Sequence, residues 1–193
     1  MIDSKIIKIL IFLIFFAIPV KSEENILLND ALQYLKNLDE FSSSFLQIQN
    51  NEISEGLFFI KDNRLRVEYH TPSKLVFILK KNQGMYYNIE LQEVQYFNPK
   101  NTIGWFLIDL FNDENFLLNS KIVKNEGYFF IYKKIKYEEE TYEIKIYFEE
   151  RPFQIRKFEI VSNLEIISFT LTNPNFNPIL NNKIFSLANP LLS

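Results

Sequence analysis

Few side chains in this 193-residue sequence have a type and spacing suited to catalysis. The single histidine, His70, comes directly before Thr71 and Pro72 in a predicted turn, so we interpret it as an exposed turn residue rather than a general base. The serines at 42–44 lie in a predicted strand without a nucleophile elbow or a histidine partner. Cysteine is absent, which excludes thiolate nucleophiles, thiolate metal sites and structural disulfides. We therefore expect that the protein is not an enzyme.

Carboxylate side chains could still support catalysis if they bound a metal ion. The only dense cluster is Glu138-Glu139-Glu140. Consecutive residues of an extended chain point to alternate faces, so these three side chains cannot all chelate one ion. We interpret the run as a solvated hairpin tip, and the same argument against chelation applies to Glu149 and Glu150. The sequence thus predicts no metal and no cofactor.

The N-terminal segment reads as a signal peptide over residues 1–22. Lys5 and Lys8 form a basic region, residues 9–18 are apolar, and Val20-Lys21-Ser22 resembles a cleavage site. The alternative is an uncleaved anchor helix, but the apolar run is well short of the roughly 20 residues that span a bilayer. We expect cleavage after Ser22 and one mature domain over residues 23–193.

Charge and size limit the partners of this mature domain. Without Asp3, Lys5, Lys8 and Lys21, the chain keeps 18 basic and 23 acidic residues, a net charge of -5. Such a chain has no electrostatic reason to bind nucleic acid. It also offers no cysteine for acylation, so we expect a protein that is exported but not itself lipid-anchored.

The elements that could position a binding site are mostly strands. The chain has 20 Phe and 10 Tyr but only 4 Gly, and aromatic side chains favour a pleated, half-buried surface. The bias is also typical of an AT-rich genome, and composition alone does not separate these two causes. Two segments, 25–38 with Leu28, Leu32 and Leu35, and 101–112, have the apolar spacing of amphipathic helices.

Between and after these helices, short runs with period-two alternation predict strands joined by tight turns. Connections this short require antiparallel pairing. These runs number about a dozen, and a sheet of 11 or 12 strands must curl, close or split. Curling around two small helices leaves either a ligand cavity or a fully packed α+β core. The predicted strands are 41–49, 53–61, 65–69, 74–79, 85–88, 93–97, 116–123, 128–136, 142–149, 154–161, 165–172 and 183–187.

Three stretches, in order along the chain, resemble the LolA family of outer-membrane lipoprotein carriers. They are the spaced residues Leu35, Leu38, Phe41, Phe45 and Gln47; the runs Gly56-Leu57-Phe58-Phe59-Ile60-Lys61 and Arg64-Leu65-Arg66-Val67-Glu68-Tyr69 with Pro72; and Phe169-Thr170-Leu171, Asn175-Phe176-Asn177 and Lys183-Ile184-Phe185. The resemblance implies a mostly β (α+β) fold, an incomplete, strongly curved antiparallel β-barrel with a helical lid. It also implies a periplasmic chaperone of a Gram-negative bacterium.

The implied task is to take triacylated lipoproteins from an inner-membrane ABC transporter to an outer-membrane receptor, with the carrier acting as a monomer. Exposed lipid chains cost about 0.8 kcal/mol per methylene, so a carrier needs a deep apolar lining. Strand alternation predicts that the lining includes Leu57, Phe59, Leu65, Val67 and Tyr69. We also expect Phe45 from the first strand, and Phe106 and Leu110 from the helix 101–112, to line it. The alternative is that these residues are ordinary core.

The family commonly has an Arg-Pro pair after the second strand, and that arginine holds the lid shut through backbone carbonyls. This chain has Lys61-Asp62-Asn63 there, so the resemblance implies Lys61 as the lid latch. Lysine lacks the planar fork of arginine donors, and its latch should be looser. Two other functions share the fold: the lipid-anchored receptor, which the missing cysteine disfavours, and a periplasmic sensor or lipid-binding module.

Overall fold

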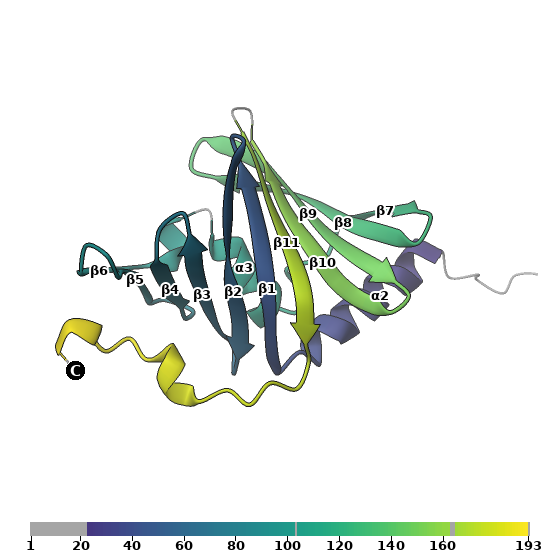
Figure 1. Cartoon of the computed structure of the whole chain (residues 1–193). Coiled ribbons are helices and arrows are strands. Elements are labelled where there is room, and N and C mark those ends of the chain that lie inside the picture. Colours follow the sequence, from purple (N-terminus) through teal and green to yellow (C-terminus); the bar gives the residue numbers. More distant parts are fainter. Residues whose placement is uncertain (1–22, 103, 163–164, 193) are drawn as a thin grey trace, which may run out of the picture.

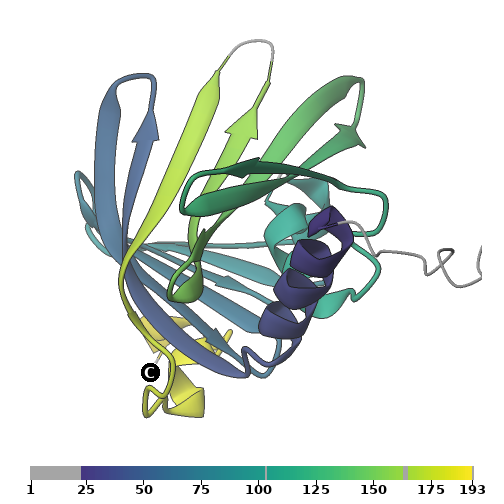
Figure 2. The same ribbon diagram turned by 90° about the vertical axis from the view of Figure 1, so that its right-hand side faces the viewer.

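The computed structural model describes residues 23–102, 104–162 and 165–192, so the expected signal peptide, residues 1–22, lies outside it. One 11-stranded antiparallel sheet curves around two helices (Figures 1 and 2). The elements are α2 (Glu23–Lys36), β1 (Glu40–Gln49), β2 (Glu52–Lys61), β3 (Arg64–Thr71), β4 (Leu75–Leu79), β5 (Gly84–Asn88), β6 (Glu93–Phe97), η1 (Pro99–Asn101), α3 (Trp105–Asn112), β7 (Lys121–Asn125), β8 (Tyr128–Tyr137), β9 (Glu140–Glu150), β10 (Phe153–Val161), β11 (Ile166–Asn175), η2 (Asn182–Phe185) and η3 (Pro190–Leu192).

The sheet is open, with β6 and β7 at its two edges. Its strand order is β6-β5-β4-β3-β2-β1-β11-β10-β9-β8-β7, so the pairing of β1 with β11 joins the two halves of the chain. The chain passes from one edge to the other through α3, which lies on the concave side of the sheet (Figure 2). The predicted incomplete barrel with a helical lid is confirmed. Neither of the helices in the described part of the chain is long and apolar enough to cross a membrane.

Tight turns fix the register of the central strands. Asp62 and Asn63 join β2 to β3 with φ of 47° and 60°, and Asn50 and Asn51 join β1 to β2 with φ of 50° and 65°. Asn and Asp tolerate this left-handed region, which two-residue hairpins of type I′ require. Within β2, Gly56 has no room for a side chain, since a Cβ there would lie 1.8 Å from the carbonyl oxygen of Glu68.

Phenylalanine rings fill the space between the concave face and the helices. Phe58 of β2 is fully buried, and its ring centroid lies 5.9 Å from that of Phe169, 6.3 Å from Phe111 and 6.4 Å from both Phe41 and Phe158. Such pairs in edge or tilted contact contribute beyond their buried area. The high phenylalanine content therefore serves one core that joins four strands to α3.

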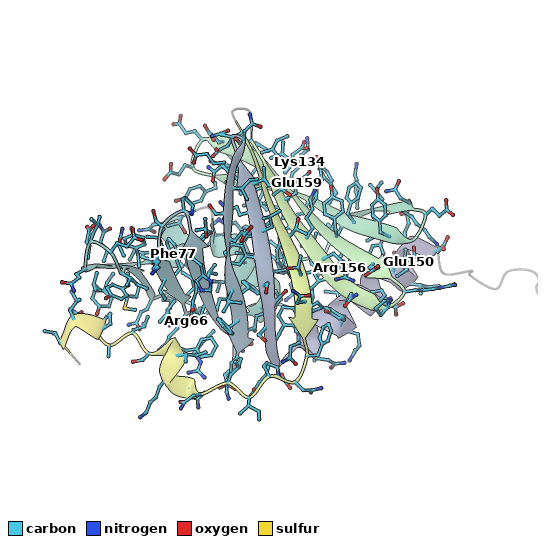
Figure 3. All side chains as sticks on the ribbon, in the orientation of Figure 1. Arg66, Phe77, Lys134, Glu150, Arg156 and Glu159 are labelled. Atoms are coloured by element: carbon cyan, nitrogen blue, oxygen red, sulfur yellow. The ribbon has the colours of Figure 1, made fainter. Side chains whose placement is uncertain are left out.

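The C-terminal strap, residues 176–192, crosses the convex face of the sheet (Figure 1). Arg66 donates a hydrogen bond to the carbonyl oxygen of Ile184 at 2.6 Å (Figure 3), and the Tyr96 hydroxyl donates to Leu187 at 3.1 Å. Phe185 is fully buried, and the Arg64 guanidinium lies 5.1 Å from its ring centroid. The strap thus covers a second, smaller core on β4 and β5, formed by Val76, Ile78 and Met85 with Leu187 against it.

Three predicted elements need correction. The predicted strand 183–187 is wrong, because the strap turns there into η2 and buries Phe185 against the convex face. The predicted strand 116–123 begins only at Lys121, since residues 115–119 form turns that end with Asn119 at a φ of 62°. The predicted helix 101–112 is divided between η1 and the shorter α3.

Candidate functional site

The acyl cavity, named after the ligand that the family resemblance implies, is an apolar hollow of about 280 Å³ between the concave face and α3. Its wall comes from β1, β3, β4, β6, β10 and β11, and α3 with the residues before it closes one side. The lining residues are Gln47, Val67, Tyr69, Phe77, Leu79, Phe97, Thr102, Gly104, Phe106, Leu107, Phe158, Ile160, Ile167 and Phe169. Eleven of these are apolar or aromatic, which is typical of a site for hydrocarbon.

Several of the residues singled out from the sequence meet at this cavity. Val67, Tyr69 and Phe106 line it. Phe45 lies directly behind the wall, with its ring stacked at 4.2 Å on Phe169. Leu65 is fully buried on the same face of the sheet, in the core beyond the cavity.

Leu110 lies elsewhere. It lines a separate hollow of about 550 Å³ between the C-terminal ends of α2 and α3, where many of the lining side chains are polar or charged, among them Lys36, Asp39 and Glu114. Leu110 is 4% exposed, so it belongs to the core under α3. The structure does not bring it to the acyl cavity.

Leu57 and Phe59 correct the prediction that placed them in the cavity. In the register of β2 and β3, Phe58 lies opposite Val67, whereas Leu57 lies opposite Glu68 and Phe59 opposite Arg66. Side chains opposite one another share a face of the sheet. Leu57 and Phe59 therefore point to the convex side, and their neighbours on β2 point inward.

The predicted latch, Lys61, also lies on the convex side. Its Nζ donates a hydrogen bond to the carbonyl oxygen of Leu180 at 2.7 Å and pairs with Glu40 at 2.8 Å. It does bind a backbone carbonyl, but the carbonyl belongs to the strap and not to the lid helix. The α3 helix meets the β2–β3 turn instead through Asn112, whose Nδ2 lies 3.5 Å from the carbonyl oxygen of Asn63.

We expect the substitution Lys61→Met to loosen the strap without changing the acyl cavity. It removes the charged donor to Leu180 and leaves the Glu40 carboxylate without this partner. A charge-assisted hydrogen bond is worth roughly 1.5–3 kcal/mol, so limited proteolysis should cut the strap faster in the variant. Binding of a fluorescent lipid probe should stay within about twofold of the wild type. A large loss of probe binding at unchanged protease resistance would restore Lys61 as a lid latch.

Two polar side chains in the cavity wall are hydrogen-bonded to each other. The Tyr69 hydroxyl donates to Oε1 of Gln47 at 2.6 Å, and Nε2 of Gln47 donates to Oε1 of Gln49 at 3.2 Å. Burial raises the pKa of Tyr69 to about 12, so its hydroxyl is a neutral donor at physiological pH. Sequence reasoning did not single out Gln47 as a site residue, although its inward position on β1 follows from the alternation with Phe45.

The residues considered for catalysis stay apart from the cavity. His70 lies near the end of β3, with its side chain 54% exposed and its Nε2 3.7 Å from Glu68. Glu138 and Glu139 form the turn between β8 and β9, which confirms the predicted hairpin tip. Within the described ranges, no three His, Cys, Asp or Glu side chains are grouped to hold a metal ion.

Comparison with solved structures gives several matches at low sequence identity. An uncharacterized conserved protein from Thermus thermophilus matches with a TM-score of 0.56 at 6% identity, covering 84% of this chain and 93% of that one. The Pseudomonas aeruginosa MucA/MucB complex matches at 0.48 and 11% identity, covering 82% of this chain and 61% of that one. LprF from Mycobacterium bovis matches at 0.42 and 11% identity, covering 79% and 92%. No curated protein sequence matches the chain.

A family match rests on the sequence itself. Residues 36–188 match the family described as outer membrane lipoprotein carrier protein LolA. This range begins at the last residue of α2 and includes every strand, α3 and most of the strap. It therefore contains all residues that line the acyl cavity, and the chain belongs to the LolA family.

Proposed function

We propose that this protein is a lipoprotein carrier that shields acyl chains in the acyl cavity. The observation that carries the proposal is the apolar hollow of about 280 Å³ closed by α3. Each methylene withdrawn from water into such a lining contributes about 0.8 kcal/mol. Membership of the LolA family, whose description names lipoprotein carriage, supports the same function.

The size of the cavity bears on how the cargo enters. About 280 Å³ lies at the lower limit of the roughly 300–1,000 Å³ that ligand pockets occupy. Three acyl chains need more room than this, so α3 and its neighbours must move outward to admit a triacylated lipoprotein. Helix α3 contributes Phe106 and Leu107 to the lining. When α3 moves outward, these two side chains would give up contacts with the sheet and contact the lipid instead.

The route of the cargo follows from the same proposal. The carrier is exported by residues 1–22, works in the periplasm as a monomer, receives lipoproteins from an inner-membrane ABC transporter and delivers them to an outer-membrane receptor. It is a binding protein and not an enzyme. The exposed position of His70 on the convex face supports this, since the only histidine lies away from the cavity.

The test is retention of a lipoprotein in solution. The full chain, expressed with residues 1–22 so that export can remove them, is purified and mixed with a triacylated lipoprotein in detergent, and the detergent is then diluted below its micellar concentration. We expect a soluble one-to-one complex on size-exclusion chromatography. Precipitation of the lipoprotein with no complex would contradict carriage and would favour a sensor or lipid-binding module on the same fold.

A further inference from the structure

One end of the acyl cavity is polar and adjoins a second hollow. Gln47 of β1, Tyr69 of β3 and Phe77 of β4 line both the acyl cavity and this neighbouring hollow of about 270 Å³. Its other lining residues include Ser54 near the start of β2 and Ser73 in the loop between β3 and β4. A ligand that spans both spaces would place its hydrocarbon among the aromatic rings and a polar group beside Gln47 and Tyr69.

At the boundary between the two hollows, the hydrogen bonds of Gln47 and Tyr69 leave one donor and one acceptor for a ligand. An amide nitrogen carries two hydrogens. In the part of the chain that the structure describes, Nε2 of Gln47 uses one of them for Gln49, at 3.2 Å. The Tyr69 hydroxyl uses its hydrogen for Gln47 at 2.6 Å, and its oxygen keeps lone pairs that can accept. The pair therefore offers one amide donor and one hydroxyl acceptor, and it suits a carbonyl oxygen or an amide.

The charges around the boundary exclude an anionic group. No lysine, arginine or histidine of the described residues lines either hollow. The polar chain from Gln47 leads through Gln49 to the carboxylate of Glu165, which accepts from Gln49 at 2.8 Å and from Asn50 at 3.3 Å. An unpaired carboxylate or phosphate taken out of water here would lose hydration without gaining a cation. A neutral carbonyl loses far less, and the free hydrogen of Gln47 replaces its bond to water.

We propose that Gln47 and Tyr69 form a subsite for the neutral carbonyl of an ester- or amide-linked acyl chain whose hydrocarbon lies in the acyl cavity. The inference rests on the proposed function and adds the chemistry of the linkage. The protein prefers chains joined through an ester or amide to free fatty acids of the same length. Such a preference lets a carrier take acylated cargo in the presence of free fatty acids.

The test compares three ligands with the same hydrocarbon length: methyl laurate, laurate and dodecane. Each competes with the neutral fluorescent probe N-phenyl-1-naphthylamine for the purified protein at pH 8. One net hydrogen bond is worth about 0.5–1.5 kcal/mol, so methyl laurate should bind about two- to twelvefold more tightly than dodecane. Laurate, which is ionised at this pH, should bind more weakly than the ester.

Two variants test the residues separately. Gln47→Leu removes the amide donor, so it should reduce the ratio of ester to alkane affinity to about one or below. Tyr69→Phe removes the hydrogen bond that orients the Gln47 amide, so it should lower the same ratio, but by less. Matched controls are Gln95→Leu, on the exposed edge strand β6, and Tyr86→Phe, whose hydroxyl accepts from Asn88 on β5 at 3.4 Å. Neither control residue lines the two hollows, so both should keep the ratio of the wild type.

The outcomes separate the subsite from carriage itself. Equal affinity for ester and alkane in the wild type, tightest binding of laurate, or an unchanged ratio in both variants would each overturn the subsite and leave the acyl cavity in place. Failure of all three ligands to displace the probe, together with failure to retain a lipoprotein in solution, would overturn the carrier function as well. Circular dichroism confirms that the variants are folded before their affinities are compared.

Discussion

Val67→Phe should abolish most binding of acyl chains. Val67 is 6% exposed and lines the acyl cavity from β3, so a phenyl ring at this position occupies space that the ligand needs. Excluding even two methylenes from the cavity costs about 1.6 kcal/mol, which corresponds to more than about tenfold in affinity. Probe displacement and retention of a lipoprotein in solution both measure the loss.

Leu57→Phe is the matched control for this prediction. Leu57 lies on the neighbouring strand β2 but faces the convex side, opposite Glu68, so a phenyl ring introduced there lies outside the cavity. Affinity for the probe should change by less than about twofold. Equal losses of affinity in the two variants would mean that a larger side chain on this part of the sheet weakens binding by destabilising the fold and not by filling the cavity.

Phe58→Ala should cause the largest loss of stability among single substitutions on β2. The side chain is fully buried, and its ring contacts four other phenylalanines on β1, α3, β10 and β11. Truncation of such a residue lowers the free energy of unfolding by about 3–5 kcal/mol, because the buried apolar surface of the ring is lost and a cavity remains in its place. Urea unfolding followed by tyrosine fluorescence measures the change in free energy of unfolding.

The next residue along β2 provides the comparison. Phe59 is half-buried on the convex face, opposite Arg66, so Phe59→Ala should cost about 1–2 kcal/mol, in line with partial burial of its surface. A larger loss for Phe59 than for Phe58 would contradict the register of β2 and β3. The two variants differ only in which face of one strand loses its aromatic side chain.

Strand β2 also shows which part of the fold sequence patterns could not predict. The run from Leu57 to Ile60 is apolar at every position, because its concave face packs in the core and its convex face lies next to the strap. A strand covered on both faces loses the period of two. The alternation of apolar and polar residues then does not indicate which side chains face the cavity. The prediction therefore placed Leu57, Phe59 and Lys61 on the wrong face of the sheet.

Strands with one solvated face were predicted correctly. On β9 and β10 the convex side carries ion pairs, Lys145 with Glu159 at 2.7 Å and Arg156 with Glu149 at 2.6 Å. Apolar and charged residues therefore alternate there, and their bounds were predicted to within a few residues. The antiparallel pairing of neighbouring strands depends on short turns and is local, so the sequence pattern captured it, although the pattern predicted one strand too many at 183–187.

The strap and the polar pair depend on contacts between distant residues. Ile184, Phe185 and Leu187 have the composition of a strand, but they form η2 and the segment after it because Arg66 and Tyr96 bind their carbonyl groups. Gln47 becomes a site residue only because Tyr69, 22 positions away, is brought to it across β2. No local pattern in one sequence carries such information.

The two free edges of the sheet, β6 and β7, affect how the sheet can deform. A closed barrel has a circumference fixed by its strand number and shear, so widening it breaks a hydrogen-bonded ladder. In the described part of this chain, the ladder ends at β6 and at β7, and α3 connects these edges across the hollow. The sheet can flatten with every strand pair intact, at the expense of side-chain packing against α2 and α3. An open sheet can therefore widen the hollow that it encloses without breaking any strand pair.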